Sequence, residues 1–272
     1  MEGFRNRLPR VLTIAGSDSG GGAGIQADLK TFTALNCYGM SVLTAITAQN
    51  TVGITGIHPI PVDIVKKQII AVMEDIGADV IKTGMLWDAN IIEAVAEVLK
   101  NYSYKYLVVD PVLVAKSGDL LLKKECIKVL KEKLIPLAWI VTPNIPELSE
   151  LSGKDVNREK DICDSARIII EMGCKYVLVK GGHLEGEVVV DRLISAYGEV
   201  KEYVHPRLNT TSTHGTGCTL SSAIACYLAY GYETSVAVGK AIEFVHKAME
   251  TAPPLGKGHG PLNHLWRIPP IE

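Results

Sequence analysis

A glycine turn directly before an apolar segment is the clearest chemical signal in this sequence. Residues 213–219 read Thr-His-Gly-Thr-Gly-Cys-Thr, and the apolar stretch that follows, 220–230, predicts a buried helix. The first amides of a helix have no partner within it, and with the helix dipole they form a site for an anion. The turn Gly215, Thr216 and Gly217 is therefore predicted to bind a phosphoryl group during its transfer.

Cys218 lies in the first turn of this predicted helix. A helix N-terminus lowers the pKa of a thiol from about 8.5 towards neutrality, so we expect Cys218 to accept the proton of an attacking hydroxyl. The alternative is a small thiol that packs under the turn, which is the usual environment of a cysteine. Its place directly after Gly-Thr-Gly favours the role in proton transfer.

Polar residues follow six apolar runs of strand length, mostly beside glycine or proline. In open α/β sheets, ligands bind outside the carboxyl ends of the strands. Any one of these residues could simply meet solvent, but the set predicts a site for a phosphorylated ligand and its magnesium ion. The six segments are 16–18 (Gly-Ser-Asp), 49–50 (Gln-Asn), 82–84 (Lys-Thr-Gly), 110–111 (Asp-Pro), 142–144 (Thr-Pro-Asn) and 180–183 (Lys-Gly-Gly-His).

Four charged or amide residues in or close to this set have specific predicted roles. Lys180 ends a buried strand, where a phosphate oxygen is a natural partner, although its side chain could also extend to water. Asp110 is a candidate magnesium ligand, because magnesium prefers a few carboxylates and several waters. Asn144 and Glu147 are three residues apart at a predicted helix start. They could position magnesium-bound waters or could only cap the helix.

The first glycine-rich loop, 20–24, gives a weaker signal. Residues 22–27 fit the G-x-G-x-x-A form of a dinucleotide-binding turn, but the glycines do not directly follow the first strand. The second strand ends in Gln49 and not in an acidic residue that could bind a ribose. The sequence contains no G-x-x-x-x-G-K-[ST] motif, which excludes a P-loop enzyme. The loop could approach a small substrate closely, or it could be only a tight turn before a helix.

Strands and helices alternate along the chain. Apolar runs at 11–15, 42–47, 80–81, 107–109, 139–141 and 177–179 are continuous, as expected for strands buried on both faces. Helical periodicity occupies 25–35, 62–76, 91–99, 162–170, 218–230 and 234–251. This alternation predicts an α/β fold with a mainly parallel sheet covered on both faces. Segments 188–193 and 200–204 predict an antiparallel hairpin at one edge. We expect one domain over residues 1–272.

Composition restricts the possible partners and the compartment. The formal net charge is -2, and no basic stripe suggests a nucleic-acid partner. The sequence has no apolar run of about 18 residues and no signal-peptide pattern, so we expect no membrane association. The six cysteines are scattered without a metal-binding spacing, which is typical of free thiols in a cytoplasmic protein.

The motifs taken together resemble a known family. Beyond the segments already given, these are 26–30 (Gln-Ala-Asp-Leu-Lys), 47–51 (Thr-Ala-Gln-Asn-Thr), Met85, 115–119 (Ala-Lys-Ser-Gly-Asp) and 258–261 (Gly-His-Gly-Pro). The sequence resembles the hydroxymethylpyrimidine/phosphomethylpyrimidine kinases of thiamine biosynthesis, nearly from end to end. The resemblance implies a ribokinase-like αβα sandwich, commonly a homodimer, that uses MgATP to phosphorylate an aminopyrimidine alcohol and then its monophosphate.

The resemblance also implies roles for single residues. Gln49 would hold the pyrimidine in a pocket lined by Gly16, Asp28 and Met85, and Cys218 would replace the aspartate base of other superfamily members. The remaining roles concern the nucleotide: Lys180, Asn144 and Thr216 would contact ATP, and Asp110, Asn144 and Glu147 would help to place magnesium. We expect the adenine contacts between Val204 and the last helices. Ser212 departs from the asparagine more often found in that loop.

Three other functions are consistent with parts of the sequence. A pyridoxal kinase of the same superfamily differs here only through Gln49, whose amide suits an aminopyrimidine edge. A regulatory domain without catalysis would be expected to lack the anion turn or the phosphate lysine, and both are present. A nicotinamide oxidoreductase depends on the weak match in the first glycine loop.

Overall fold

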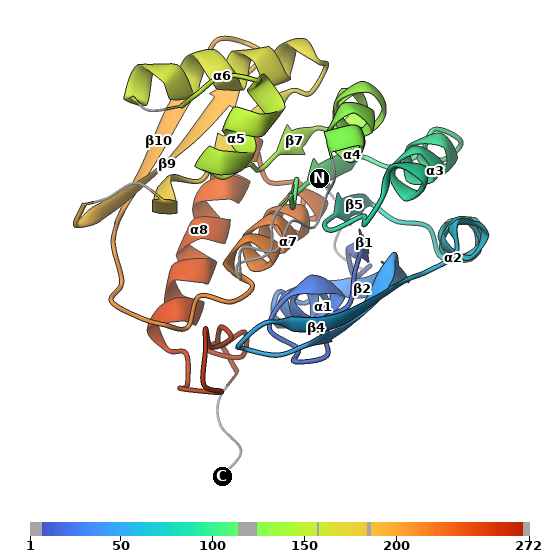
Figure 1. Cartoon of the computed structure of the whole chain (residues 1–272), viewed down its shortest axis with the longest axis horizontal. Coiled ribbons are helices and arrows are strands. Elements are labelled where there is room, and N and C mark those ends of the chain that lie inside the picture. Colours follow the sequence, from blue (N-terminus) through green and yellow to red (C-terminus); the bar gives the residue numbers. More distant parts are fainter. Residues whose placement is uncertain (1–6, 114–123, 157, 184–185, 269–272) are drawn as a thin grey trace.

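One eight-stranded sheet forms the centre of the protein (Figure 1). The computed structural model describes residues 7–113, 124–156, 158–183 and 186–268, so the predicted motif at 115–119 lies outside the described residues. The strands are β1 (Arg10–Ala15), β2 (Tyr38–Leu43), β5 (Val80–Thr83), β6 (Tyr106–Val109), β7 (Ile140–Val141), β8 (Tyr176–Val179), β9 (Val188–Ser195) and β10 (Val200–Pro206). They pair in the order β10-β9-β8-β7-β6-β5-β1-β2. Only β8–β9 and β9–β10 are antiparallel, which confirms the mainly parallel sheet with an antiparallel edge hairpin.

Helices cover both faces of the sheet, as an αβα sandwich requires. One face packs against α1 (Gly24–Ala34), α7 (Thr216–Ala229) and α8 (Thr234–Glu250). The other packs against α2 (Val62–Asp75), α3 (Ala89–Leu99), α4 (Lys124–Val129), α5 (Ile145–Ser152) and α6 (Glu159–Glu171). Shorter helical turns occupy Leu130–Leu134, Ile135–Leu137 and Gly181–His183.

The continuous apolar strands follow from this arrangement. Successive side chains of a strand point to opposite faces of the sheet. In β6, Val108 belongs to the core beneath α7 and α8, whereas Leu107 and Val109 belong to the core beneath α2 to α6. Both faces are therefore buried, and a strand cannot show the alternating pattern of a half-exposed sheet.

A separate two-stranded sheet was not predicted. The apolar run 42–47 predicted one strand, but the chain turns at Thr44, whose amide donates to the Ala15 carbonyl and whose hydroxyl donates to the Met85 carbonyl. The chain then forms β3 (Ala45–Gln49), which pairs antiparallel with β4 (Ile54–Pro59). Most of β4 is exposed or half-buried, so it lacks the buried apolar pattern that identified the other strands. We call this two-stranded sheet, β3 and β4, the flap. Gln49 consequently belongs to the flap and not to the central sheet.

The helix boundaries follow from local chemistry. Gly77 and Gly173 follow α2 and α6 with φ of 70° and 125°, as predicted for residues that end helices. At the start of α5, Asn144 accepts from the Glu147 amide at 2.9 Å, and Glu147 accepts from the Asn144 amide at 2.8 Å. Across the described residues, every helix is too short or too polar to cross a membrane.

Candidate active site

A cavity of about 1010 Å³ lies at the carboxyl ends of the parallel strands. Its lining includes at least one residue from each of the six predicted segments, and every residue that was given a specific predicted role except Asp28. The walls come from the loop after β1, the flap, the loops after β5 to β8, the start of α7 and one side of α8. The polar strand ends therefore meet at one place, as predicted.

Gly215 shapes the turn before α7. Its φ is 84°, and a Cβ there would overlap the carbonyl oxygen of Gly22 in the first glycine loop. Only glycine accepts both conditions without strain. The close approach brings the two glycine-rich loops together at the mouth of α7.

Some of the backbone amides at this turn are free to bind a ligand, but the Thr216 amide, which was predicted to be free, is not. The Thr216 amide points to the Thr213 carbonyl at 3.4 Å, and the Thr216 hydroxyl donates to the same oxygen at 2.7 Å. Thr216 therefore turns its polar atoms back into the loop and not towards a ligand. Within the described part of the chain, no backbone carbonyl accepts from the amides of Gly217 or Cys218. These two amides are available to an anion.

Lys180 faces the same turn. A Cβ on Gly217 would lie 3.3 Å from Lys180 Nζ and 3.6 Å from Asp110 Oδ2. Lys180 Nζ also lies 3.0 Å from Asp110 Oδ1 and 3.7 Å from Glu147 Oε2. Burial alone would lower the pKa of Lys180, but the two carboxylates outweigh it and raise that pKa, so the lysine stays charged. A cation and two free amides thus face one volume.

Two buried carboxyl groups share one cation in this cluster. Asp110 and Glu147 are 2% and 6% exposed, and Lys180 is their shared cation. Burial raises the pKa of Glu147 to about 7, opposed by Lys180 and reinforced by Asp110. Among the described residues, no group of three or more His, Cys, Asp or Glu side chains forms a metal site by itself. Two carboxylates with free space beside them match the few ligands that magnesium takes from protein.

The predicted low pKa of Cys218 is wrong for the protein without ligands. Burial raises the pKa of this thiol to about 11. Lys82 and the Gly24 amide lower it, but the carboxylates of Asp28 and Asp110 act in the opposite direction. The sequence could not reveal these neighbours, which come from distant segments. Cys218 is still partly exposed to the cavity and belongs to neither hydrophobic core, so it is not a packing residue.

Asp28 does not line the cavity, contrary to the prediction. Its side chain is fully buried and accepts two hydrogen bonds from Lys82 Nζ, both at 2.9 Å. It also accepts from the hydroxyls of Thr13 at 2.6 Å and Ser222 at 2.7 Å. Asp28 therefore acts from behind the cavity wall, through Lys82.

Lys82 belongs to one of the six predicted segments, but no role of its own was predicted for it. It is fully buried, yet it contributes to the cavity wall. Burial alone would lower the pKa of Lys82, but the charges of Asp28, Cys218 and Asp110 raise it. The signal available in the sequence was its place at the end of a buried strand, where a lysine needs an anionic partner.

The opposite end of the cavity suits a small flat ligand. Gln49 and Met85 line it together with Gly16, where a Cβ would overlap the Met85 Cε atom. The Thr47 hydroxyl donates to the Ser17 carbonyl at 2.8 Å and also lies 3.1 Å from Gln49 Oε1. The Gln49 amide group, which can both donate and accept, therefore lies beside this hydroxyl in the cavity wall.

The first glycine loop closes around a carboxylate and does not bind a dinucleotide. Asp18 accepts from the amides of Gly20, Gly22 and Ala23 at 2.8 to 3.0 Å. A pyrophosphate would need these donors, so the oxidoreductase hypothesis is wrong. Asp18 also pairs with His214 at 2.8 Å.

For the third part of the cavity, the sequence predicted only the region, between Val204 and the last helices, and no individual residues. Ile242, Val245 and Met249 of α8 line it, opposite His205 and Pro206 at the end of β10. In the sequence, the α8 residues form a helical stripe that cannot be told from ordinary core. This part lies where the adenine contacts were expected.

Comparison with known proteins decides the family. The family profile described as "Phosphomethylpyrimidine kinase" matches residues 18–263. The chain belongs to this family. A hydroxymethylpyrimidine/phosphomethylpyrimidine kinase from Bacillus subtilis is 45% identical over 94% of both chains. The "Thiamine biosynthesis bifunctional protein ThiED" of Geobacter sulfurreducens is 50% identical over 96% of this chain, which spans only 54% of that longer relative.

A solved structure supports the fold. Pyridoxal kinase from Staphylococcus aureus, in complex with AMP-PCP and pyridoxal, is 35% identical, with a TM-score of 0.89 over 96% of this chain and 95% of the other. The same kinase has been solved with ADP. Family members and this neighbour share the ribokinase-like fold, which confirms the predicted fold class.

Proposed function

We propose that this chain is an ATP-dependent kinase that phosphorylates 4-amino-5-hydroxymethyl-2-methylpyrimidine to the monophosphate and then to the diphosphate, for thiamine biosynthesis. One observation carries the proposal: the free amides of Gly217 and Cys218 and the charged Lys180 face one volume between the Gln49 end and the α8 end of the cavity. A phosphoryl donor and an alcohol acceptor can therefore meet at the start of α7.

In this proposal, different residues stabilise the charge of the phosphoryl group and accept the proton of the alcohol. The two amides and Lys180 stabilise the charge that develops on the phosphoryl group in transfer. The Cys218 thiolate accepts the proton of the alcohol in the first phosphorylation. In the second phosphorylation, the acceptor is a phosphate oxygen that is already ionised, so no base is needed.

Magnesium fits the same site. Asp110 and Glu147 are the residues that would hold the ion, because Lys180 leaves their charge only partly balanced. The ion would neutralise phosphate charge when bound. The ADP and AMP-PCP complexes of the S. aureus pyridoxal kinase support the use of ATP.

Pyridoxal is the alternative acceptor, because the S. aureus neighbour binds it and has a TM-score of 0.89. Gln49 favours the aminopyrimidine, since a primary amide can both donate to a ring nitrogen and accept from an amino group. We expect Gln49→Ala to reduce kcat/KM for the aminopyrimidine about 10-fold or more and that for pyridoxal less, at about 1 kcal/mol per hydrogen bond.

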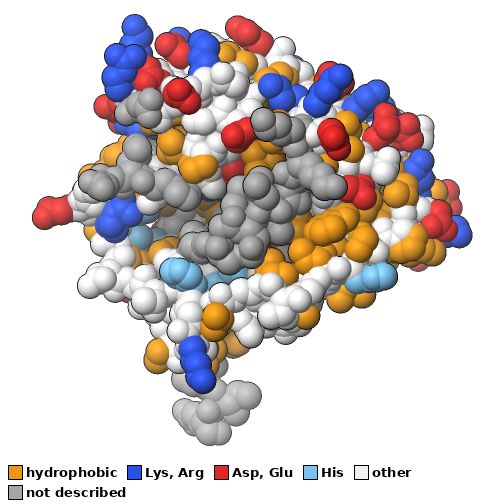
Figure 2. Space-filling model, in the orientation of Figure 1, with side chains coloured by type: hydrophobic (Ala, Val, Ile, Leu, Met, Phe, Trp, Pro, Cys, Tyr) orange, Lys and Arg blue, Asp and Glu red, His pale blue; other side chains and the backbone are white. Residues whose placement is uncertain are grey.

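The proposed enzyme is a single-domain cytoplasmic homodimer. Six free thiols suit a reducing compartment. The flap exposes Ile46 at 48% and the adjacent loop exposes Val52 at 68%, which supports contact with a second copy. No nucleic-acid partner is proposed. On the face of the molecule shown in Figure 2, positive and negative side chains are interspersed, and the formal net charge of the chain is -2.

Steady-state kinetics with MgATP test the proposal. The purified chain would be assayed with the aminopyrimidine alcohol, its monophosphate and pyridoxal as separate acceptors. We expect turnover of the first two, with the highest kcat/KM of the two alcohols for the aminopyrimidine. Turnover of pyridoxal alone would support the alternative, and turnover of none would overturn the kinase function.

A further inference from the structure

A histidine–aspartate pair lies beside the phosphate lysine. His205 Nε2 on β10 is 3.2 Å from Asp191 Oδ2 on β9. The other oxygen of Asp191 accepts from the Gly181 amide at 2.8 Å, and Gly181 directly follows Lys180. A Cβ on Gly181 would overlap the Val190 carbonyl, so this loop is held tightly against β9. The position of His205 is thus fixed relative to the phosphate end of the cavity.

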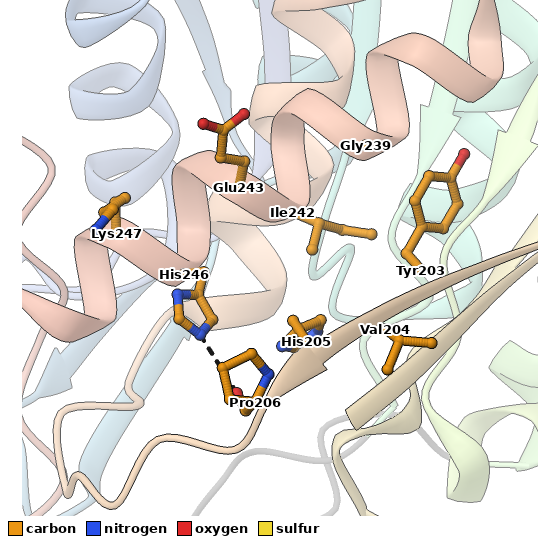
Figure 3. Close-up of a pocket in the computed structure, with 9 residues that line it drawn as sticks. All are labelled: Tyr203, Val204, His205, Pro206, Gly239, Ile242, Glu243, His246 and Lys247. Carbon is orange, nitrogen blue, oxygen red and sulfur yellow. Dashed lines mark hydrogen bonds between the residues drawn. The ribbon is translucent and has the colours of Figure 1, made fainter. Parts of the chain in front are cut away.

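The second ring nitrogen of His205 is buried without a partner. Nδ1 makes no hydrogen bond to any part of the chain that the structure describes. Buried polar atoms nearly always have a partner, so a ligand is the natural source of one. His205 lines the large cavity and also a side groove of about 460 Å³ between β10 and α8 (Figure 3).

The neighbouring histidine cannot supply that partner. The ring of His246 stands edge-on to that of His205, with centroids 5.5 Å apart. Its Nε2 lies 3.3 Å from the Pro206 carbonyl, the contact dashed in Figure 3. His246 is therefore directed to the backbone, and Nδ1 of His205 remains for a bound molecule.

The place of His205 indicates which part of the nucleotide it meets. On one side, Asp191 ties it to the loop of Lys180, which faces the phosphates. On the other side is α8, where Ile242 lines both the cavity and the groove and offers an apolar surface for the base. The ribose joins the phosphates to the base in ATP. A ribose hydroxyl can both donate and accept, so it can pair with Nδ1 in either protonation state of the ring.

We propose that His205, held by Asp191, binds a ribose hydroxyl of ATP. Nε2 faces a carboxylate, which only accepts, so the hydrogen is on Nε2 and Nδ1 is left as an acceptor without a partner among the described residues. This assignment rests on the proposed use of ATP and adds a residue that distinguishes the sugar of the nucleotide. Asp191 acts through His205 and Gly181 as a positioning residue.

Equilibrium titration of the full chain with three nucleotides tests this assignment without any acceptor substrate. The nucleotides are MgATP, 2′-deoxy-ATP and 3′-deoxy-ATP with magnesium. We expect His205→Phe to weaken binding of ATP about three- to tenfold and to have no effect on the deoxynucleotide that lacks the contacted hydroxyl. His205→Asn should recover part of the affinity, because its amide group can reach the place of Nδ1.

Two controls make the outcome specific. Tyr203 lines the side groove but not the large cavity, and its hydroxyl donates to the Ser235 carbonyl. Tyr203→Phe removes only this hydroxyl and should bind all three nucleotides as the unaltered chain does. An equal loss for all three nucleotides in His205→Phe, or no loss for any, would overturn the assignment and leave the kinase proposal intact. If the unaltered chain did not bind ATP, the proposed function and this assignment would both be wrong.

Discussion

His214 Nε2 lies 2.8 Å from Asp18 Oδ2, and this contact joins two loops that are 196 residues apart in the chain. Asp18 also binds three amides of the first glycine loop, and His214 begins the turn before α7. The carboxylate therefore holds the first loop in shape and fixes it against the anion turn. The shape of the phosphate site depends on a contact that neither loop could make alone.

We expect Asp18→Asn to destabilise the protein by about 1–3 kcal/mol at pH 7, because an amide cannot accept all four hydrogen bonds. Burial alone would raise the pKa of Asp18, but hydrogen bonds from His214 and the amides outweigh it and hold that pKa below its usual value. A carboxylate whose pKa is lower in the folded state than in the unfolded state stabilises the folded state at pH values above its unfolded pKa. This stabilisation is lost as the pH falls through the folded pKa. Urea unfolding should therefore show a difference between variant and wild type that shrinks below pH about 4. A difference of the same size at pH 7 and pH 3 would contradict this.

Gly217→Ala should separate activity from stability. Gly217 is helical, so alanine should leave stability unchanged or raise it by about 0.5–1 kcal/mol. The added methyl group would lie 3.3 Å from Lys180 Nζ, in the space of the transferring phosphate, and we expect kcat/KM for ATP to fall at least about 10-fold. Gly215→Ala is the matched comparison, since φ of 84° and the contact with Gly22 should reduce stability as well. Thermal unfolding and kinetics of both variants check this, and full activity in Gly217→Ala would count against the placement of the phosphate.

The Asp28–Lys82 pair should show strong energetic coupling. Both side chains are fully buried, and Asp28→Asn would leave the lysine without its carboxylate, at a cost of about 3–5 kcal/mol. Adding Lys82→Met removes the unpaired charge, so the double variant should be more stable than Asp28→Asn alone. Free energies of unfolding in denaturant for the two single variants and the double variant measure the coupling. Additive losses would mean that the pair does not act as a unit.

The sequence was most informative for features that the geometry of the fold class determines. Parallel strands all end at one edge, so Asp110 and Lys180, 70 residues apart, could be expected to meet, and they lie 3.0 Å apart. The glycine turn was equally readable, because an unpaired helix N-terminus is a local property of its own residues. The fold class followed from the continuous apolar runs for the same reason.

Other features depended on tertiary contacts that no local pattern encodes. Asp28 is on a helix, and only the packed structure shows that it points to Lys82 and not into the cavity. The pKa of Cys218 depends on charges from three distant segments. The flap was missed because a single threonine at position 44 redirects the chain between two apolar runs.

The raised pKa of Cys218 predicts a pH dependence for the first phosphorylation. A thiol with a pKa of about 11 is mostly protonated at neutral pH, and the fraction of thiolate grows about tenfold per pH unit. We expect kcat/KM for the alcohol to rise over pH 7 to 9 by about that factor per unit. The second phosphorylation should depend on pH much less, because its acceptor is already ionised. A first step that is flat over this range would show that the free thiolate is not the base.

The most direct measurement is the kinetics of Cys218→Ala in the two phosphorylations, assayed separately with the alcohol and with the monophosphate. Alanine keeps the backbone amide and removes only the thiol. We predict that the first step slows by about 10²–10⁴-fold, the usual contribution of a general base, while the second changes less than about tenfold. Equal losses in both steps would contradict the assignment of Cys218 as the proton acceptor.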